Sequence, residues 1–117
     1  MWTERIKYLN TLEEIDNYVK NINCFHDYYM GNFKYDGTNA AICIEEPTKT
    51  TFKDGETGRV WDLEFTNITS IKIENDCILK FLIKDTYIND EHLVLEFDQG
   101  YLKIKADKII LGIPKEL

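Results

Sequence analysis

The spacing of apolar residues changes once along the chain, from a helical period to a strand period. Apolar residues first recur at intervals of three and four, at Leu12, Ile15, Val19 and Ile22. This spacing places them on one stripe of an amphipathic helix. Thr11 and Glu14 fit a capping box, in which the Thr11 hydroxyl accepts a hydrogen bond from the backbone N–H of Glu14. We therefore predict a helix over residues 12–22.

Beyond residue 23, apolar and polar residues alternate with a period of two, which is typical of strands with one buried face. The predicted strands cover residues 25–35, 39–45, 59–66, 68–74, 77–84, 92–97 and 101–106. Gly31 interrupts the first of them and predicts a bulge or bend. Asp36-Gly37 is the preferred pair for a type I′ turn, so the first two strands should form a tight antiparallel hairpin.

This order of elements predicts an α+β, mainly β fold. Short strands follow one another without the intervening helices that a parallel sheet requires, which favours an antiparallel β-sandwich or open barrel of about seven strands. The single N-terminal amphipathic helix should pack on the sheet. Because no linker interrupts the pattern, we predict one domain over residues 1–117. Residues 48–59 form the longest polar stretch, which is either a hairpin tip or a binding loop.

The net charge of −7 and the pI near 4.8 limit the classes of partner. Binding to a nucleic acid requires a positive surface, so we expect no nucleic-acid partner. An acidic surface suits a basic protein, although acidity also serves solubility. No apolar run reaches the length needed to cross a bilayer and the first residues lack a signal-peptide pattern, which predicts a cytoplasmic location without membrane contact. The sequence leaves the homo-oligomeric state open.

The residues that most often bind metals are few and widely spaced. Cys24, Cys43 and Cys77 form no C-x-x-C pair, and with His92 they give no zinc-ligand spacing. The acidic segment 85–91 lacks the glycine and the final glutamate of a calcium loop. We predict no metal and no cofactor.

His26-Asp27 is the one place where an imidazole and a carboxylate are adjacent in a segment predicted to be ordered. Neighbouring side chains of a strand point to opposite faces, so the two groups should not bond to each other. No nucleophile-elbow pattern accompanies them. We therefore predict that His26 and Asp27 have a structural role, and that the chain has no catalytic residues and is not an enzyme.

Two sets of side chains are candidates for binding. Glu45, Glu46, Asp62 and Glu64 form a candidate acidic face that suits a basic protein partner. Tyr28, Tyr29 and Trp61 form a candidate aromatic groove for a small ligand or carbohydrate, or for an enzyme's substrate.

Two short segments give the chain a family resemblance. Phe25-His26-Asp27 begins the first predicted strand and Leu63-Glu64-Phe65-Thr66-Asn67-Ile68 lies in the middle of the chain. In both, the sequence resembles a loose set of small uncharacterised bacterial β-rich proteins with a Phe/Leu-His-Asp signature, some of which are grouped with toxin-immunity proteins. The resemblance implies a non-enzymatic protein-binding domain that neutralises its partner, with His26 and Asp27 as a structural signature. The aromatic groove is the alternative basis for function.

Overall fold

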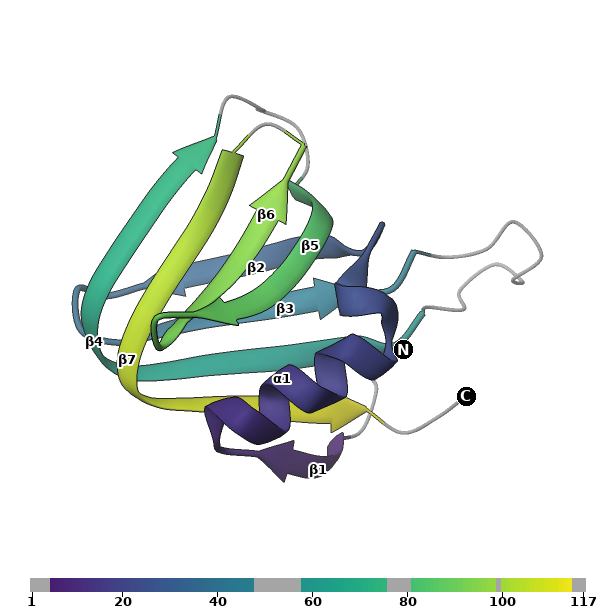
Figure 1. Cartoon of the computed structure of the whole chain (residues 1–117), viewed down its shortest axis with the longest axis horizontal. Coiled ribbons are helices and arrows are strands. Elements are labelled where there is room, and N and C mark those ends of the chain that lie inside the picture. Colours follow the sequence, from purple (N-terminus) through teal and green to yellow (C-terminus); the bar gives the residue numbers. More distant parts are fainter. Residues whose placement is uncertain (1–4, 48–57, 76–80, 99, 115–117) are drawn as a thin grey trace.

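The computed structural model describes residues 5–47, 58–75, 81–98 and 100–114. Within these ranges the chain forms seven strands, one α-helix and one short turn of helix (Figure 1). The elements are β1 (Arg5–Leu9), α1 (Leu12–Asn21), η1 (Asn23–Phe25), β2 (Tyr29–Tyr35), β3 (Ala40–Glu45), β4 (Val60–Asn75), β5 (Phe81–Asn89), β6 (His92–Phe97) and β7 (Gly100–Pro114). The predicted mainly antiparallel β fold with one helix is confirmed.

The helix begins at the predicted cap. Thr11 Oγ1 accepts from the backbone N–H of Glu14 at 3.2 Å, and the Thr11 hydroxyl donates to Glu14 Oε1 at 2.9 Å. These bonds satisfy donors that a helix start leaves without intrahelical partners. Ile15 and Val19 are fully buried against the sheet, as their spacing predicts. The helix therefore covers the core with its apolar stripe.

All strand pairs are antiparallel, and their order is β1-β7-β4-β3-β2-β5-β6 with an additional pairing between β6 and β7. The sequence of neighbours thus returns to β7. Figure 1 shows how β4 and β7 achieve this: both are long, curved and side by side, with β4 next to β3 at one end and β7 next to β6 at the other. The side chains on the concave side of these strands form the core.

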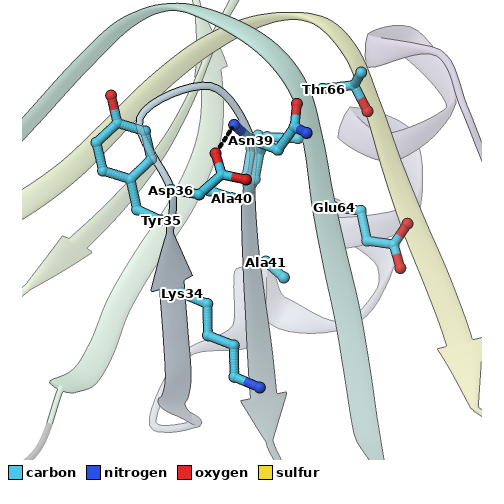
Figure 2. A pocket seen from close by; sticks show the side chains of 9 residues that line it. Lys34, Tyr35, Asp36, Asn39, Ala40, Ala41, Glu64 and Thr66 are labelled. Carbon is cyan, nitrogen blue, oxygen red and sulfur yellow. Dashed lines mark hydrogen bonds between the residues drawn. The ribbon is translucent and has the colours of Figure 1, made fainter.

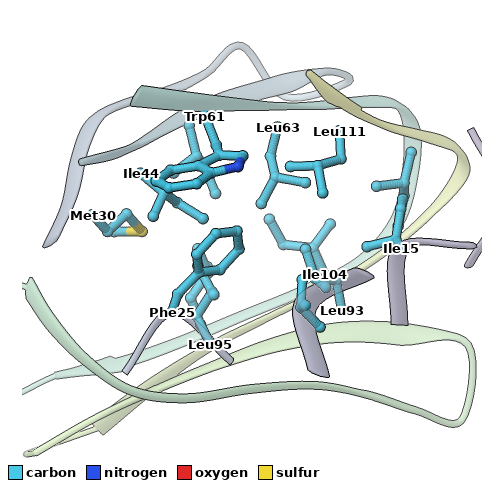
Figure 3. Packing of buried hydrophobic residues seen from close by; sticks show 14 of the residues in the cluster. Ile15, Phe25, Met30, Ile44, Trp61, Leu63, Leu93, Leu95, Ile104 and Leu111 are labelled. Atoms are coloured by element: carbon cyan, nitrogen blue, oxygen red, sulfur yellow. The ribbon is translucent and has the colours of Figure 1, made fainter. Parts of the chain in front are cut away.

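The core is one cluster that joins every layer (Figure 3). Its largest fully buried side chains are Trp61, Phe25, Phe65, Ile15, Ile42, Ile44, Leu63, Ile83, Leu95, Leu102, Ile104 and Leu111. They come from the helix, from η1 and from five strands. Burial of this apolar surface is the main favourable term in the folding free energy.

Several predicted strand boundaries are wrong, although the number of strands agrees. β1 was not predicted, because two of its three apolar side chains, Ile6 and Tyr8, face solvent. The strands predicted at 59–66 and 68–74 are one strand, β4, in which Asn67 adopts a φ of 53° beside a register shift. That shift is a bulge and not a strand end. The last predicted strand, 101–106, extends to Pro114 as β7.

The observed strand β2 begins four residues later than the strand predicted over residues 25–35. Asn23, Cys24 and Phe25 have φ values of 59°, 55° and 57°, so they form a left-handed turn, and β2 begins only at Tyr29. Met30 is buried, whereas the predicted odd-numbered face ends in the exposed Tyr35. The predicted bulge at Gly31 is confirmed by a register shift between Gly31 and Lys34.

The β2–β3 hairpin closes through a four-residue loop and not through the predicted type I′ turn. Tyr35 pairs with Ala40, and the Asp36 carboxylate accepts from the backbone N–H groups of Thr38 and Asn39 at 2.8 and 2.7 Å (Figure 2). Only Gly37 has a positive φ, of 96°. Asp36 therefore sets this turn through its side chain.

β5 and β6 join at a residue pair that the sequence pattern did not indicate. Residues 85–90 were predicted to be a loop, but β5 continues to Asn89, which pairs with His92. Asp90 and Glu91 between them have φ values of 50° and 61°, as a type I′ turn requires. The predicted strand 92–97 is confirmed as β6. Residues 77–80 of the predicted strand 77–84, and residues 48–57 of the polar stretch 48–59, lie outside the described residues.

Thr86 provides a first test of the core. It is 1% exposed, and its Oγ1 has no hydrogen-bond partner among the described residues. A buried hydroxyl without a partner costs about 1–3 kcal/mol. We expect Thr86→Val, which keeps the shape and removes the hydroxyl, to raise the free energy of unfolding by about 1 kcal/mol in urea denaturation. Thr86→Ser keeps the hydroxyl and should lower it; equal losses in both variants would contradict this account.

The β5–β6 turn provides a second test. Glu91 is exposed and its backbone has a left-handed conformation. Its ion pair with Lys105, at 3.5 Å, joins two well-solvated side chains. A left-handed conformation costs a non-glycine residue roughly 1–2 kcal/mol, whereas an exposed ion pair contributes at most about 1. Glu91→Gly should therefore stabilise the protein by about 1 kcal/mol, measured by thermal denaturation. Glu91→Ala, the matched control, loses the same ion pair without relieving the backbone and should give no gain.

Candidate functional site

The outer face of β2, β3 and β4 is the surface that faces away from the core. On β3 it carries Ala41, Cys43 and Glu45, which alternate with the buried Ala40, Ile42 and Ile44. Glu64 and Asp62 of β4 lie opposite Ala41 and Cys43 in the antiparallel register. Strand alternation thus places Glu45, Asp62 and Glu64, three of the four predicted acidic residues, on this outer face.

The negative charge of Asp62 is balanced by an ion pair with Arg5. The Nε of Arg5 on β1 lies 2.7 Å from Asp62 Oδ2, and the Arg5 side chain is only 5% exposed. The Cys43 thiol donates to the other carboxylate oxygen, Oδ1, at 3.4 Å. Burial, together with Asp62, raises the pKa of this thiol, so Cys43 stays protonated at neutral pH. Asp62 therefore fixes β1 to the sheet and adds no net charge to the outer face.

Glu46 does not belong to the outer face. It follows Glu45 directly and points to the other side, where its carboxylate binds the Arg59 guanidinium, with Oε2 at 2.8 Å from Nη2. It also accepts from the Tyr28 hydroxyl at 3.2 Å. Burial would raise the pKa of Glu46, but the bonds and charge of Arg59 outweigh it, so the pKa is lowered. Of the predicted acidic face, Glu45 and Glu64 alone form no ion pair with any described residue.

The predicted aromatic groove is a packed cluster and not an open groove. Trp61 is 0% exposed; its ring lies 5.3 Å from Phe25 in an edge-to-face contact and 5.4 Å from Tyr28. The guanidinium of Arg59 lies 5.0 Å from the Trp61 ring centroid. Burial, then the Glu46 carboxylate, raises the pKa of Tyr28. Tyr29 pairs with Glu45 and, since side chains alternate along a strand, lies on the face opposite Met30.

His26 and Asp27 lie closer together than predicted. They occupy a turn and not a strand, so His26 Nε2 is 3.5 Å from Asp27 Oδ2. The prediction that strand geometry separates them is wrong for this reason. His26 Nδ1 lies 2.9 Å from the Lys84 carbonyl, and the Asp27 N–H donates to the Ile83 carbonyl at 2.8 Å. Both residues thus hold the left-handed turn against β5.

Cys24, two residues before His26 in the chain, has the raised pKa of an unactivated thiol. Burial, and then the neighbouring Asp85 carboxylate, raises the pKa of Cys24. A nucleophilic cysteine needs a lowered pKa, which an imidazolium or another positive group supplies. The pKa of Cys24 is therefore shifted in the direction opposite to that of an activated thiol.

An open notch of about 380 Å³ lies at the hairpin end of the outer face (Figure 2). Lys34, Ala41 and Glu64 form one row across β2, β3 and β4, because Ala41 pairs with Lys34 on one side and Glu64 on the other. Asn39 and Thr66 lie at the turn end of the notch. The sequence analysis missed Lys34: the Asp36-Gly37 signal pairs the strands, but the bulge and the four-residue loop decide which residues face each other.

Comparisons with known proteins add no family: no family model, no curated protein and no solved structure matches the chain. The resemblance to the toxin-immunity group stays a prediction. Among the described residues, no helix has the length and apolar content needed to cross a membrane.

The Glu46–Arg59 pair predicts a dependence of stability on pH. Since the folded-state pKa of Glu46 lies below its ordinary value of 4.5, its stabilising contribution is complete above that pH and is lost as the pH falls through the lowered folded-state pKa. We expect Glu46→Gln to lower the free energy of unfolding by about 2 kcal/mol at pH 7, by urea denaturation. The difference from the unmodified protein should shrink below pH 4.5. Glu45→Gln, its exposed neighbour, should change little at either pH; equal losses at both sites would refute the assignment.

Proposed function

We propose that the chain is a non-enzymatic protein-binding domain, and that its contact surface is the outer face of β2, β3 and β4. The observation that carries the proposal is the exposure of Glu45 and Glu64 on adjacent strands, neither of them in an ion pair with a described residue. Four other described carboxylates, those of Asp16, Glu46, Asp62 and Glu91, do have cationic partners within 4 Å. Two outer-face carboxylates without an ionic partner among the described residues favour a binding partner that brings positive charge.

The charge of the whole chain supports the same type of partner. A net charge of −7 attracts a basic protein at long range and speeds its association. Glu45 and Glu64 would then orient the partner at contact. Selectivity follows because a partner with an acidic surface is repelled by both the overall field and these two side chains.

Apolar groups at one border of this surface supply the contact area that charge alone does not. Tyr8 and Ile6 of β1 are 63% and 60% exposed. Tyr8 pairs with Gly112, which in turn pairs with Asp62, so β1 continues the outer face beyond β4 and β7. Exposed tyrosine beside polar groups is typical of the residues that dominate protein interfaces.

Toxin neutralisation is the specific form of this function that the sequence resemblance implies. In such a role the acidic outer face would cover a basic surface of the toxin. The competing aromatic groove loses its main element, because Trp61 is fully buried. A nucleophilic enzyme is disfavoured by the raised pKa of Cys24.

The test is affinity capture from the source organism, followed by titration calorimetry with the captured protein once purified. Glu45→Lys/Glu64→Lys should weaken binding at least tenfold, because two attractive contacts become repulsive. Glu74→Lys/Asp98→Lys is the matched control: it changes the net charge equally at exposed positions, and Glu74 lies roughly 33 Å from Glu64 along β4. Its affinity should change less than threefold.

Equal loss in both double variants would leave only non-specific attraction and would overturn the outer face as the contact surface. Failure to capture any protein, with the adjacent gene product also tested directly, would overturn the function itself. Circular dichroism of each variant ensures that a loss of binding is not a loss of fold.

A further inference from the structure

We infer that the notch between Lys34 and Glu64 is a binding site for a small zwitterion of the free α-amino acid class. The notch is the space above Ala41, whose methyl group is the only side chain between two long charged ones in the row that crosses β2, β3 and β4. With a volume of about 380 Å³, it falls in the size range of small-molecule sites. This inference does not depend on a protein partner.

The two charges at the notch are available to a ligand. Lys34 and Glu64 are exposed, and neither forms an ion pair with any residue that the structure describes. Elsewhere in the molecule, Lys20 pairs with Asp16 at 2.8 Å and Lys105 with Glu91 at 3.5 Å. Lys34 and Glu64 instead stand on either side of Ala41 (Figure 2).

The separation of the two charges selects the ligand. Neighbouring strands lie about 4.8 Å apart, so residues two strands apart have Cα atoms roughly 10 Å apart, and both long side chains can rotate toward the space above Ala41. A charge-assisted hydrogen bond at each end takes about 2.8 Å. At most roughly 4 Å then remains for the ligand's own separation of ammonium and carboxylate, which admits the short separation within an α-amino acid.

The end wall of the notch supplies neutral polar groups. Asn39 Oδ1 accepts from the backbone N–H of Asn67 at 3.0 Å, which orients the amide and leaves its Nδ2 as a donor. The Thr66 hydroxyl lies beside it on the exposed side of β4. Asp36 holds the backbone of Thr38 and Asn39 through two bonds, and the pKa of this carboxyl is lowered by those bonds, first that of Asn39 and then that of Thr38. The wall is thus fixed before a ligand arrives.

The test is a titration of the ¹⁵N-labelled protein with L-alanine, followed by backbone amide shifts. Propionate and ethylammonium, each carrying one of the two charges, are the matched probes. We expect saturable shifts centred on Lys34, Ala41 and Glu64, with alanine binding at least tenfold more tightly than either single-charge probe. Equal affinity for the three probes, or no saturable shift with alanine, would overturn the site.

Variants connect the affinity to the named residues. Lys34→Gln and Glu64→Gln should each weaken alanine binding at least tenfold, and Ala41→Leu should abolish it by filling the notch. Lys72→Gln, an exposed lysine farther along β4, is the control and should bind as the unmodified protein does. Unchanged affinity in Lys34→Gln would refute the proposal even if Glu64→Gln binds less well, because a zwitterion site requires both charges.

Discussion

The buried indole of Trp61 is the contact on which the arrangement of the other elements depends. Its Nε1–H donates to the Tyr18 hydroxyl at 2.9 Å, which ties the helix to β4. A buried indole needs such a partner, because an unsatisfied N–H in the core costs stability. The Phe25 and Tyr28 rings pack against the same indole and bring the left-handed turn and the start of β2 to it. Helix, turn and sheet therefore meet at one side chain.

The left-handed turn persists because its surroundings compensate for its backbone. Three successive non-glycine residues with positive φ cost roughly 1–2 kcal/mol each. Full burial of Phe25 returns about 2–3 kcal/mol, and the turn also completes hydrogen bonding between β2 and β5. Within the described ranges those strands pair directly at two positions, after which the Asp27 N–H binds the Ile83 carbonyl and the Ile83 N–H binds the Tyr28 carbonyl. Without the turn, this part of β5 would have an open edge.

The sequence predicts the parts of this structure that depend on local periodicity. The helix and β6 follow from the spacing of their own residues, whatever lies around them. β1 could not be predicted in this way, because a strand whose tyrosine and isoleucine face solvent reverses the expected pattern. The left-handed turn contains no glycine, the residue that most often indicates a positive φ. Both became visible only when contacts distant in sequence, such as Arg5 with Asp62, were known.

For the candidate site too, features set by local alternation are predictable from the sequence, and features set by distant contacts are not. Strand alternation alone separates Glu45 from Glu46, so that part of the acidic face was open to correction from the sequence. The pairing of Asp62 with Arg5 spans 57 residues, so it could not be inferred from the sequence. The row of Lys34, Ala41 and Glu64 depends on a bulge and a loop length, each of which shifts register by a residue or more. Sites that span three strands are therefore the least accessible to sequence reasoning.

The pairing of β1 with the end of β7 has a consequence for how the chain acquires its structure. Arg5 faces Pro114 and Leu9 faces Leu111, so the two ends of the described chain are neighbours in the sheet. β7 is also the strand that joins β4 to β6. A ribosome releases the chain from its N-terminus, so β1 must wait without a partner until nearly the last described residue has emerged. Folding is therefore expected to occur after synthesis of this domain and to be slow, because its decisive contacts join the most distant segments.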